Sequence, residues 1–347
     1  MKFYNHQHKY YCGIDLHARS LYVCILDSTG KQVKHRNIMA RPEDLMKAIE
    51  KFNDDLVIAV ECMFTWYWVA DFCEEHHIKF VLGHALYMKA IHGGKAKNDK
   101  IDSHKIATLL RGGMLPMAYV YPKKNRATRD LLRRRTHLMR KRAELMAHIV
   151  NLNSQYNLPE MALDLRQQKN RDSLKNHYSE LSVQKSVDLD LSLIAFYDDH
   201  LSSIEWYIEK TTKITDYQNY MLLRSIPGVG LILALIILYE INDISRFKRV
   251  QDFASYARLV KCTKESGGKK LGTSGSKIGN AHLKWAFSEA AILFLRGNPE
   301  AQEYVEKLAN KHGKAKALSI LAHKLGRVVY IILKRRIAFD ANKFVTI

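Results

Sequence analysis

The feature that most constrains the fold is a long stretch without glycine. Residues 124–220 contain no glycine and a single proline, Pro159. Glycine and proline are the residues that most often end helices, so their absence predicts long helices. Leucines recur there every seven residues, at Leu131, Leu138, Leu145 and Leu152. We therefore predict two long helices, joined near residues 159–185, that form a helical coiled-coil arm over residues 123–220.

The residues before the arm follow an α/β pattern. Short apolar runs predict strands at residues 11–14, 21–27, 32–39, 56–60 and 79–82, and helical spacing predicts helices at 42–52 and 66–76. Three consecutive strands followed by alternation indicate a mixed sheet with helices on its faces. We expect this α/β domain to span residues 10–122.

The residues after the arm read as mainly α-helical. A loop rich in glycine, serine and lysine interrupts them at residues 264–279. The predicted division is therefore three domains, at residues 10–122, 123–220 and 221–347.

Charge limits the kind of partner. The chain has 55 Lys and Arg against 35 Asp and Glu, a formal net charge of +20. Most of the excess lies in residues 111–175, with 15 basic and 5 acidic residues, and in residues 246–284, with 10 and 2. Such an excess favours a nucleic acid partner. The sequence shows no apolar run long enough to cross a bilayer, and its five cysteines are scattered, so we expect a cytoplasmic protein with no membrane partner.

Four acidic residues form a candidate metal site. Asp15 and Glu61 each end a predicted strand, while Asp99 and Asp102 lie three apart at the start of a predicted helix, on one face. Carboxylates from three elements can hold Mg²⁺, which supports phosphoryl transfer. The alternative is that Asp99 and Asp102 only cap the helix.

Two glycine motifs lie in the C-terminal part. Ile226-Pro227-Gly228-Val229-Gly230 resembles the turn of a helix-hairpin-helix module, where Gly228 and Gly230 would let backbone N–H groups reach a DNA phosphate; the alternative is a tight turn between helices. In the second motif Ser266 precedes two glycines. Its hydroxyl can attack a phosphodiester, with Lys269, Lys270 and Lys277 holding phosphate, but Thr273, Ser274 and Ser276 are rival hydroxyls, and spacing alone favours a phosphate-binding loop.

Together these motifs resemble the DEDD transposases of the IS110 insertion-sequence family, which includes the Piv-type invertases. The resemblance rests on five pieces in a fixed order: Gly13-Ile14-Asp15, Glu61, Asn98-Asp99-Lys100-Ile101-Asp102, the Gly228 motif, and Ser266-Gly267-Gly268 with Ser276-Lys277-Ile278-Gly279-Asn280.

The resemblance implies a RuvC-like, RNase H-like N-terminal domain whose Asp15, Glu61, Asp99 and Asp102 bind Mg²⁺. It also implies a C-terminal transposase domain in which Ser266 is the catalytic nucleophile. Family members use a structured guide RNA, the bridge RNA, that pairs with donor and target DNA. They assemble as homo-oligomers up to tetramers, in which the acids of one subunit meet the serine of another. A nucleoid-associated location follows.

Three departures from the family pattern concern loops rather than the acids or the serine. Cys62-Met63-Phe64 follows Glu61 where a small, glycine-containing turn is usual. Arg258 and Lys261 replace a usual glycine and proline, and Lys284 stands where arginine is common. These changes bear on guide and target recognition.

We therefore predict an RNA-guided recombinase that cleaves and exchanges DNA strands through a serine–DNA intermediate. The basic arm is predicted to hold the guide RNA through Arg133, Arg134, Arg135, Arg140, Lys141 and Arg142, although a solvated face explains any one of them. One alternative is a RuvC-like nuclease or junction resolvase that uses water, with Ser266 structural. Another is a non-catalytic scaffold that binds RNA and DNA.

Overall fold

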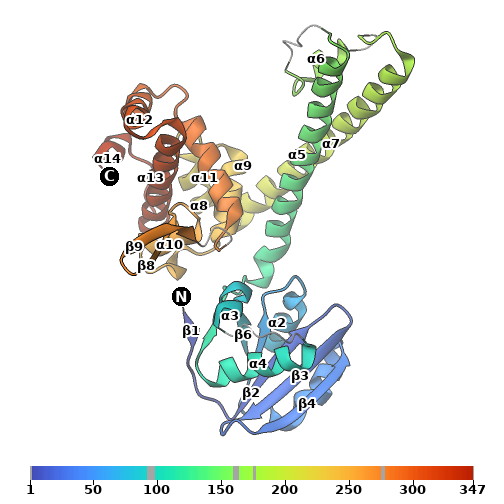
Figure 1. Ribbon diagram of the computed structural model, residues 1–347, viewed down its shortest axis with the longest axis vertical. Coiled ribbons are helices and arrows are strands. Elements are labelled where there is room, and N and C mark those ends of the chain that lie inside the picture. Colours follow the sequence, from blue (N-terminus) through green and yellow to red (C-terminus); the bar gives the residue numbers. More distant parts are fainter. Residues whose placement is uncertain (1, 92–97, 159–163, 175–176, 275–277, 347) are drawn as a thin grey trace. The chain divides into compact units, whose positions relative to one another are not determined.

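The computed structural model describes residues 2–91, 98–158, 164–174, 177–274 and 278–346. The chain forms two compact units, Met1–Lys124 and Asn125–Ile347. Figure 1 shows a unit built around one sheet and a unit dominated by helices. Among the described residues, no helix has the length and apolar character needed to span a bilayer.

The first unit contains seven strands, four helices and a 3-10 turn in its described part. In chain order these are β1 (Phe3–Tyr4), β2 (Tyr10–Leu16), β3 (Ser20–Asp27), β4 (Gln32–Met39), α1 (Pro42–Ile49), η1 (Glu50–Phe52), β5 (Leu56–Glu61), α2 (Trp66–Glu75), β6 (Lys79–Gly83), α3 (Ala85–Ile91), α4 (Asp99–Arg111) and β7 (Leu115–Pro116). The strands and helices predicted for residues 11–82 are confirmed, with ends that differ by at most three residues.

The central sheet is mixed, as predicted. Its order is β4-β3-β2-β5-β6; β2, β3 and β4 are antiparallel neighbours, whereas β2, β5 and β6 run parallel. Short turns permit the antiparallel pairs, and the helical crossovers α1 and α2 permit the parallel ones. The carboxyl ends of β2 and β5 therefore meet at one edge of the sheet.

Each face of the sheet buries a separate apolar cluster. On one face, even-numbered residues of β2 such as Cys12 and Ile14 pack with α1 and α2. On the other face, Tyr11 and Ala59 pack with α4. A Cβ atom built on Gly13 would lie 2.3 Å from the backbone nitrogen of Ala107 and 2.3 Å from the carbonyl oxygen of Ser103. Because no side chain fits there, α4 rests directly on β2.

The second unit is mostly helical, as predicted for this part of the chain. Its elements are α5 (Lys123–Gln155), α6 (Gln168–Asp172), α7 (Leu181–Thr215), α8 (Tyr217–Arg224), α9 (Leu231–Ile241), η2 (Ile244–Arg246), α10 (Val250–Tyr256), β8 (Cys262–Ser266), β9 (Lys269–Ser274), α11 (Ala281–Phe294), α12 (Pro299–His312), α13 (Lys314–Arg335) and α14 (Ala341–Thr346). One large apolar cluster joins α8 to α14 with the adjacent ends of α5 and α7.

Helices α5 and α7 are the two long helices predicted from the glycine-free stretch. Ion pairs join Arg135 to Glu205, Arg142 to Asp198 and His148 to Asp190, so the helices run antiparallel. Buried Ile149 and Val187 belong to a separate apolar cluster between the C-terminal part of α5 and the N-terminal part of α7. Coiled-coil geometry of this pair and the three-domain division both remain predictions.

Replacing Gly13 with alanine should destabilise the first unit. The new methyl group meets backbone atoms of α4 that cannot rotate away, and overpacking of this kind costs about 1–3 kcal/mol. Denaturant unfolding of Gly13→Ala should therefore show a loss of about 2 kcal/mol. Gly230→Ala, where a new Cβ meets nothing within 4 Å, serves as the matched control, and equal losses in both variants would contradict the packing argument.

Candidate functional site

Two acidic residues lie level with each other at one edge of the sheet. Ile14 of β2 pairs in register with Val60 of β5, so Asp15 and Glu61 follow at the carboxyl ends of two parallel strands. Side chains alternate between faces along a strand, so both residues project to the face that α4 covers. The register thus confirms that these two predicted residues share one edge and one face.

The first turn of α4 adds two more carboxylates. The Asn98 side chain caps this helix by accepting a hydrogen bond of 2.7 Å from the Lys100 N–H. Asp99 and Asp102 occupy the first turn, where their charge also favours the helix dipole. Because the next residue, Ser103, lies against Gly13, the start of the helix is held beside Asp15.

The carboxylate charges of α4 act on Asp15 in β2 and change its pKa. Burial raises the pKa of Asp15, and the charges of Asp99 and Asp102 raise it further against the lowering effect of His17. The Asp15 side chain is 18% exposed, whereas that of Asp99 is 57% exposed. Ionising a half-buried carboxylate among like charges costs free energy unless a cation compensates the charge. Such a cluster therefore favours the binding of a metal ion.

His17 is part of this cluster and was missed by the sequence reasoning. Its Nε2 atom lies 3.4 Å from an oxygen of Asp15 and 3.4 Å from an oxygen of Asp99. Ligand atoms of these three residues all lie within 4.8 Å of one another. The available signal was the Asp-x-His spacing at a strand end, since residues two apart share a face. Asp102 and Glu61 are not members of this closest group: the charge of Asp102 acts on Asp15, and Glu61 follows Val60, the register partner of Ile14.

The donor set fits a hard divalent cation. It offers carboxylate oxygens and one imidazole nitrogen, which suit Mg²⁺ or Mn²⁺ and leave positions for water or phosphate. Among the described residues, Lys105 Nζ lies 3.4 Å from an oxygen of Asp102. The cluster can therefore hold a cation and bring it to a phosphate.

Ser266 lies at the tip of a β-hairpin, so the loop predicted over residues 264–279 is wrong for residues 264–274. Strands β8 and β9 pair antiparallel, and Ser266 is the partner of Lys269 across a two-residue turn. Gly267 and Gly268 have φ of +56° and +74°, the combination that a type I′ turn requires. A Gly-Gly pair between two strand-like runs was the missed signal.

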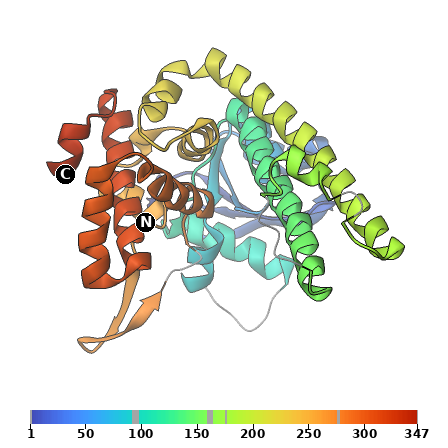
Figure 2. The same ribbon diagram turned by 90° about the horizontal axis from the view of Figure 1, so that it is seen from above.

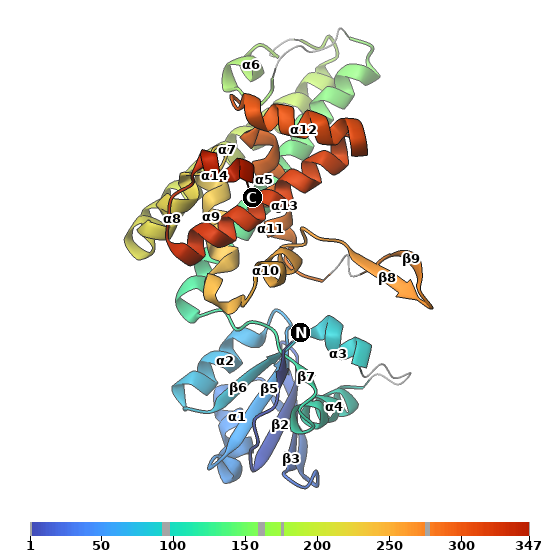
Figure 3. The ribbon, with the colours of Figure 1, turned by 90° about the vertical axis from the view of Figure 1, so that its left-hand side faces the viewer.

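The hairpin exposes the residues predicted to contact phosphate. Ser266, Lys269 and Lys270 are all exposed, and Figure 3 shows β8 and β9 extending away from the helices of their own unit. Lys277 lies outside the described residues. The tip of the hairpin thus presents the Ser266 hydroxyl together with the ammonium groups of Lys269 and Lys270.

The glycine motif at residues 226–230 has a packing role at one of its two positions. Gly228 has φ of +78°, and a Cβ atom there would lie 2.5 Å from the backbone nitrogen of Phe294 in α11. Gly230 precedes α9 and faces open space. Gly230 therefore leaves the start of α9 accessible, whereas Gly228 is required by the tight turn between helices.

Most of the basic residues predicted on the arm already have acidic partners. Arg133 pairs with Glu240, Arg135 with Glu205, Arg142 with Asp198, and Lys141 with Glu144. Arg134 and Arg140 are exposed on α5. These two arginines are the members of the set best placed to meet a polyanion.

One departure from the family pattern has a structural reading. Arg258 has φ of +56°, a left-handed conformation that glycine adopts without strain. Its Nε atom donates a hydrogen bond of 3.0 Å to the carbonyl of Ile278, just before α11. Arg258 thus adopts a backbone conformation that glycine favours, and its side chain bonds the segment before α11.

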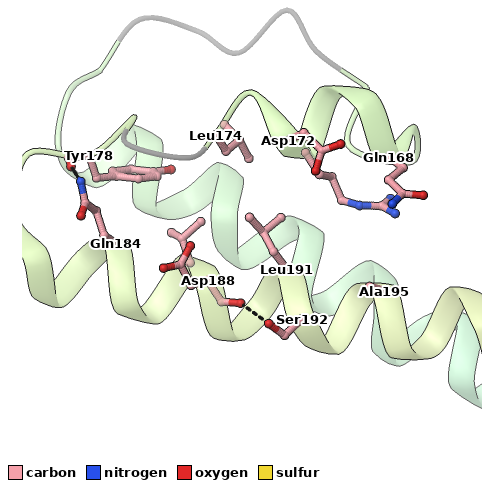
Figure 4. A pocket seen from close by; sticks show the side chains of 11 residues that line it. Gln168, Asp172, Leu174, Tyr178, Gln184, Asp188, Leu191, Ser192 and Ala195 are labelled. Carbon is pink, nitrogen blue, oxygen red and sulfur yellow. Dashed lines mark hydrogen bonds between the residues drawn. The ribbon is translucent and has the colours of Figure 1, made fainter.

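A hollow of about 570 Å³ lies beside the N-terminal part of α7, near α6. Figure 4 shows Leu174, Tyr178 and Asp188 among the side chains that line it, with Gln184 bonded to the Tyr178 backbone. None of the predicted site residues line this hollow. It is therefore separate from both the acid cluster and the serine hairpin.

Family models match both parts of the chain. The DEDD model of the IS110 type, described as "Transposase", matches residues 12–157. The model described as "Transposase IS116/IS110/IS902 family" matches residues 220–306. The first range contains the acid cluster, and the second contains the serine hairpin.

Curated relatives agree with these models. The transposase for insertion sequence element IS1111A of Coxiella burnetii is 22% identical over 350 residues, which cover 93% of this chain and 89% of the relative. The transposase for insertion sequence element IS1533 of Leptospira borgpetersenii is 23% identical over 70% of this chain and 72% of the relative. A pilin gene-inverting protein of Moraxella lacunata is 30% identical over 42% of this chain and 47% of the relative.

The two-glycine turn predicts a sharp dependence of the hairpin on residue type. Changing Gly267-Gly268 to Ala-Ala forces two residues with side chains to positive φ, at a cost of roughly 1 kcal/mol each. Amide hydrogen exchange in residues 262–274 should then accelerate about 30-fold, because each 1.4 kcal/mol is a factor of ten. Asn-Gly, which also favours type I′ turns, is the control and should keep the slow exchange. Equal exchange in both variants would refute the assigned turn.

Proposed function

Because the chain belongs to the IS110 family of DEDD transposases, we propose that it is an RNA-guided recombinase that joins donor and target DNA through a serine–DNA intermediate. Family membership makes the protein a transposase or recombinase enzyme, which argues against an inert scaffold. The observation that carries the finer proposal is the group of acids around Asp15, built by the register of β2 and β5 and by the seating of α4.

The acids supply the cation site in this proposal. Asp15, Glu61, Asp99 and Asp102 would hold Mg²⁺ in a RuvC-like, RNase H-like domain, with His17 beside Asp15 and Asp99. The bound cation would polarise the scissile phosphate and stabilise charge on the leaving oxygen. In this proposal the phosphate approaches from the side of Asp99 and Asp102, whose side chains are more exposed than that of Asp15.

The serine hairpin supplies the nucleophile. Ser266 Oγ attacks the phosphorus, a serine–phosphate bond forms, and the bond to the 3′ oxygen breaks. The serine gives up one proton and the 3′ oxygen gains one, so the step is balanced. A 3′-hydroxyl from the partner strand then attacks the phosphoserine and releases Ser266. The phosphodiester energy is kept in the serine ester, so strand exchange needs no nucleotide cofactor.

Assembly is part of the proposal. We infer that the acid cluster and Ser266 act on the same phosphate in a homo-oligomer, a dimer or tetramer, in which either one chain or two neighbouring chains supply the two groups. Lys269 and Lys270 on the hairpin, together with the start of α9 at Gly230, offer phosphate contacts. Donor and target sequences are then read by base pairing with the guide RNA.

Ser266→Ala should abolish the covalent protein–DNA adduct on a cleaved DNA substrate while DNA binding persists. Asp15→Asn should also abolish it, because the phosphate is no longer activated. Denaturing gel electrophoresis of a suicide substrate measures the adduct. The control is Thr263→Ala, which removes another exposed hydroxyl from the same hairpin.

The same experiment separates the proposal from a nuclease that uses water. A Ser266→Ala protein that still cuts DNA in the presence of Mg²⁺, without forming an adduct, would replace the serine mechanism with direct hydrolysis. The acid cluster would then be the whole active site.

Guide RNA binding should depend on the exposed arginines of α5. Replacing Arg134 and Arg140 with glutamine should weaken RNA binding and reduce the slope of log affinity against log salt by about one to two, since each removes up to one phosphate contact. Filter binding at several salt concentrations measures this. Lys141→Gln is the matched control because Lys141 pairs with Glu144. An unchanged salt slope in the double variant would remove α5 from the RNA interface.

A further inference from the structure

A buried carboxylate lies where α5, α9 and α11 meet. Glu240, near the end of α9, is 3% exposed. Arg129 Nε donates to it at 3.1 Å, Arg133 Nε at 2.7 Å and Nη2 at 3.0 Å, and Asn280 Nδ2 at 2.7 Å. Three separate elements therefore share one carboxylate.

Glu240 is ionised at neutral pH in spite of its burial. Burial alone would raise its pKa, but the hydrogen bond from Arg133 and the charges of Arg129 and Arg133 lower it to about 2. A carboxylate whose pKa is lower in the folded state than in the unfolded state stabilises the fold above the unfolded pKa, here 4.5. This stabilisation is lost as the pH falls towards the folded pKa of about 2. The contact is thus a permanent feature at physiological pH.

Asn280 connects this carboxylate to the serine hairpin. Asn280 lies between the serine hairpin and α11 and caps that helix. Its Oδ1 accepts hydrogen bonds from the N–H groups of His282 and Leu283 at 2.9 and 3.1 Å. Its own N–H donates to the Tyr256 carbonyl at 2.6 Å. The amide of one side chain therefore bonds α11 with its oxygen and Glu240 with its nitrogen.

The other end of the hairpin is held by the same neighbourhood. Arg258 follows α10 and donates to the Ile278 carbonyl, so the chain before β8 is tied to the chain after β9. The foot of the hairpin, residues 256–261 and 278–280, is fixed from both sides, whereas its tip at Ser266 is exposed.

Stability alone does not account for the choice of an ion pair here. An apolar set of similar volume is often as stable as a buried ion pair, whereas a hydrogen-bonded carboxylate has directional partners and fixes one arrangement. The arrangement fixed by Glu240 is the position of the hairpin foot relative to α5.

The geometry points to Glu240 and Asn280 as positioning residues for Ser266, which clamp the foot of the serine hairpin to α5 through Arg129 and Arg133. This inference rests on the proposed role of Ser266. The clamp also gives α5, the helix that carries Arg134 and Arg140, a direct mechanical connection to the nucleophile.

Asn280→Ser tests the clamp with little risk to the fold. Serine is a good helix cap and keeps an acceptor for the α11 N–H groups, but it has no amide to donate to Glu240. We expect faster amide exchange in residues 254–261 and 278–284. We also expect a 10- to 100-fold slower single-turnover rate of adduct formation, the penalty typical of a misplaced reactive group, with DNA affinity within about twofold of the native value.

A second variant and a matched control complete the experiment. Glu240→Gln should give the same pattern, if it folds. Asp198→Asn breaks a similar bridge, in which Asp198 pairs with Arg142 and Arg171, two residues that lie outside the hairpin foot. It should leave both the exchange at the foot and the adduct rate unchanged.

The outcomes are distinguishable. Native exchange and a native adduct rate in Asn280→Ser would overturn the clamp, and so would an equal loss in Asp198→Asn. If the native protein forms no adduct, the serine mechanism fails, but the exchange measurement still decides the clamp: faster exchange confined to the foot supports it, and unchanged exchange overturns it.

Discussion

The acid cluster depends on one contact without a side chain. Helix α4 lies on β2 because Gly13 lets the backbone of Ser103 and Ala107 approach the strand. A strand position with any other residue would push the helix outward and carry its first turn, with Asp99 and Asp102, away from Asp15. The position of the carboxylates therefore depends on the missing Cβ atom of Gly13, two residues before Asp15.

Much of the first unit could be predicted because its signals are local. Apolar runs located five strands to within three residues, and strand-end acids identified Asp15 and Glu61 before their register was known. Register follows once two strands are known to be parallel neighbours. The long helices α5 and α7 could also be predicted, because the lack of glycine is visible in the sequence itself.

Other features depend on partners distant in the chain and could not be predicted. In the sequence, Arg133 is one of six similar basic residues of the arm. Only the structure shows that it pairs with Glu240, 107 positions later. Periodicity could not distinguish a solvated arginine face from a helix interface, because both place arginines on α5. The hairpin at Ser266 was missed for a different reason: the glycine pair marks its turn, but the polar, lysine-rich strands on either side lack the apolar alternation of a half-buried strand.

Arg258 shows how a side chain can hold its own backbone in a costly conformation. Its φ of +56° is one that residues with a side chain rarely adopt, and its Nε atom donates to the Ile278 carbonyl. Because Arg258 precedes β8 and Ile278 follows β9, this one bond closes the two-stranded segment into a loop. The stem of that loop is thus secured by a residue that belongs to neither strand.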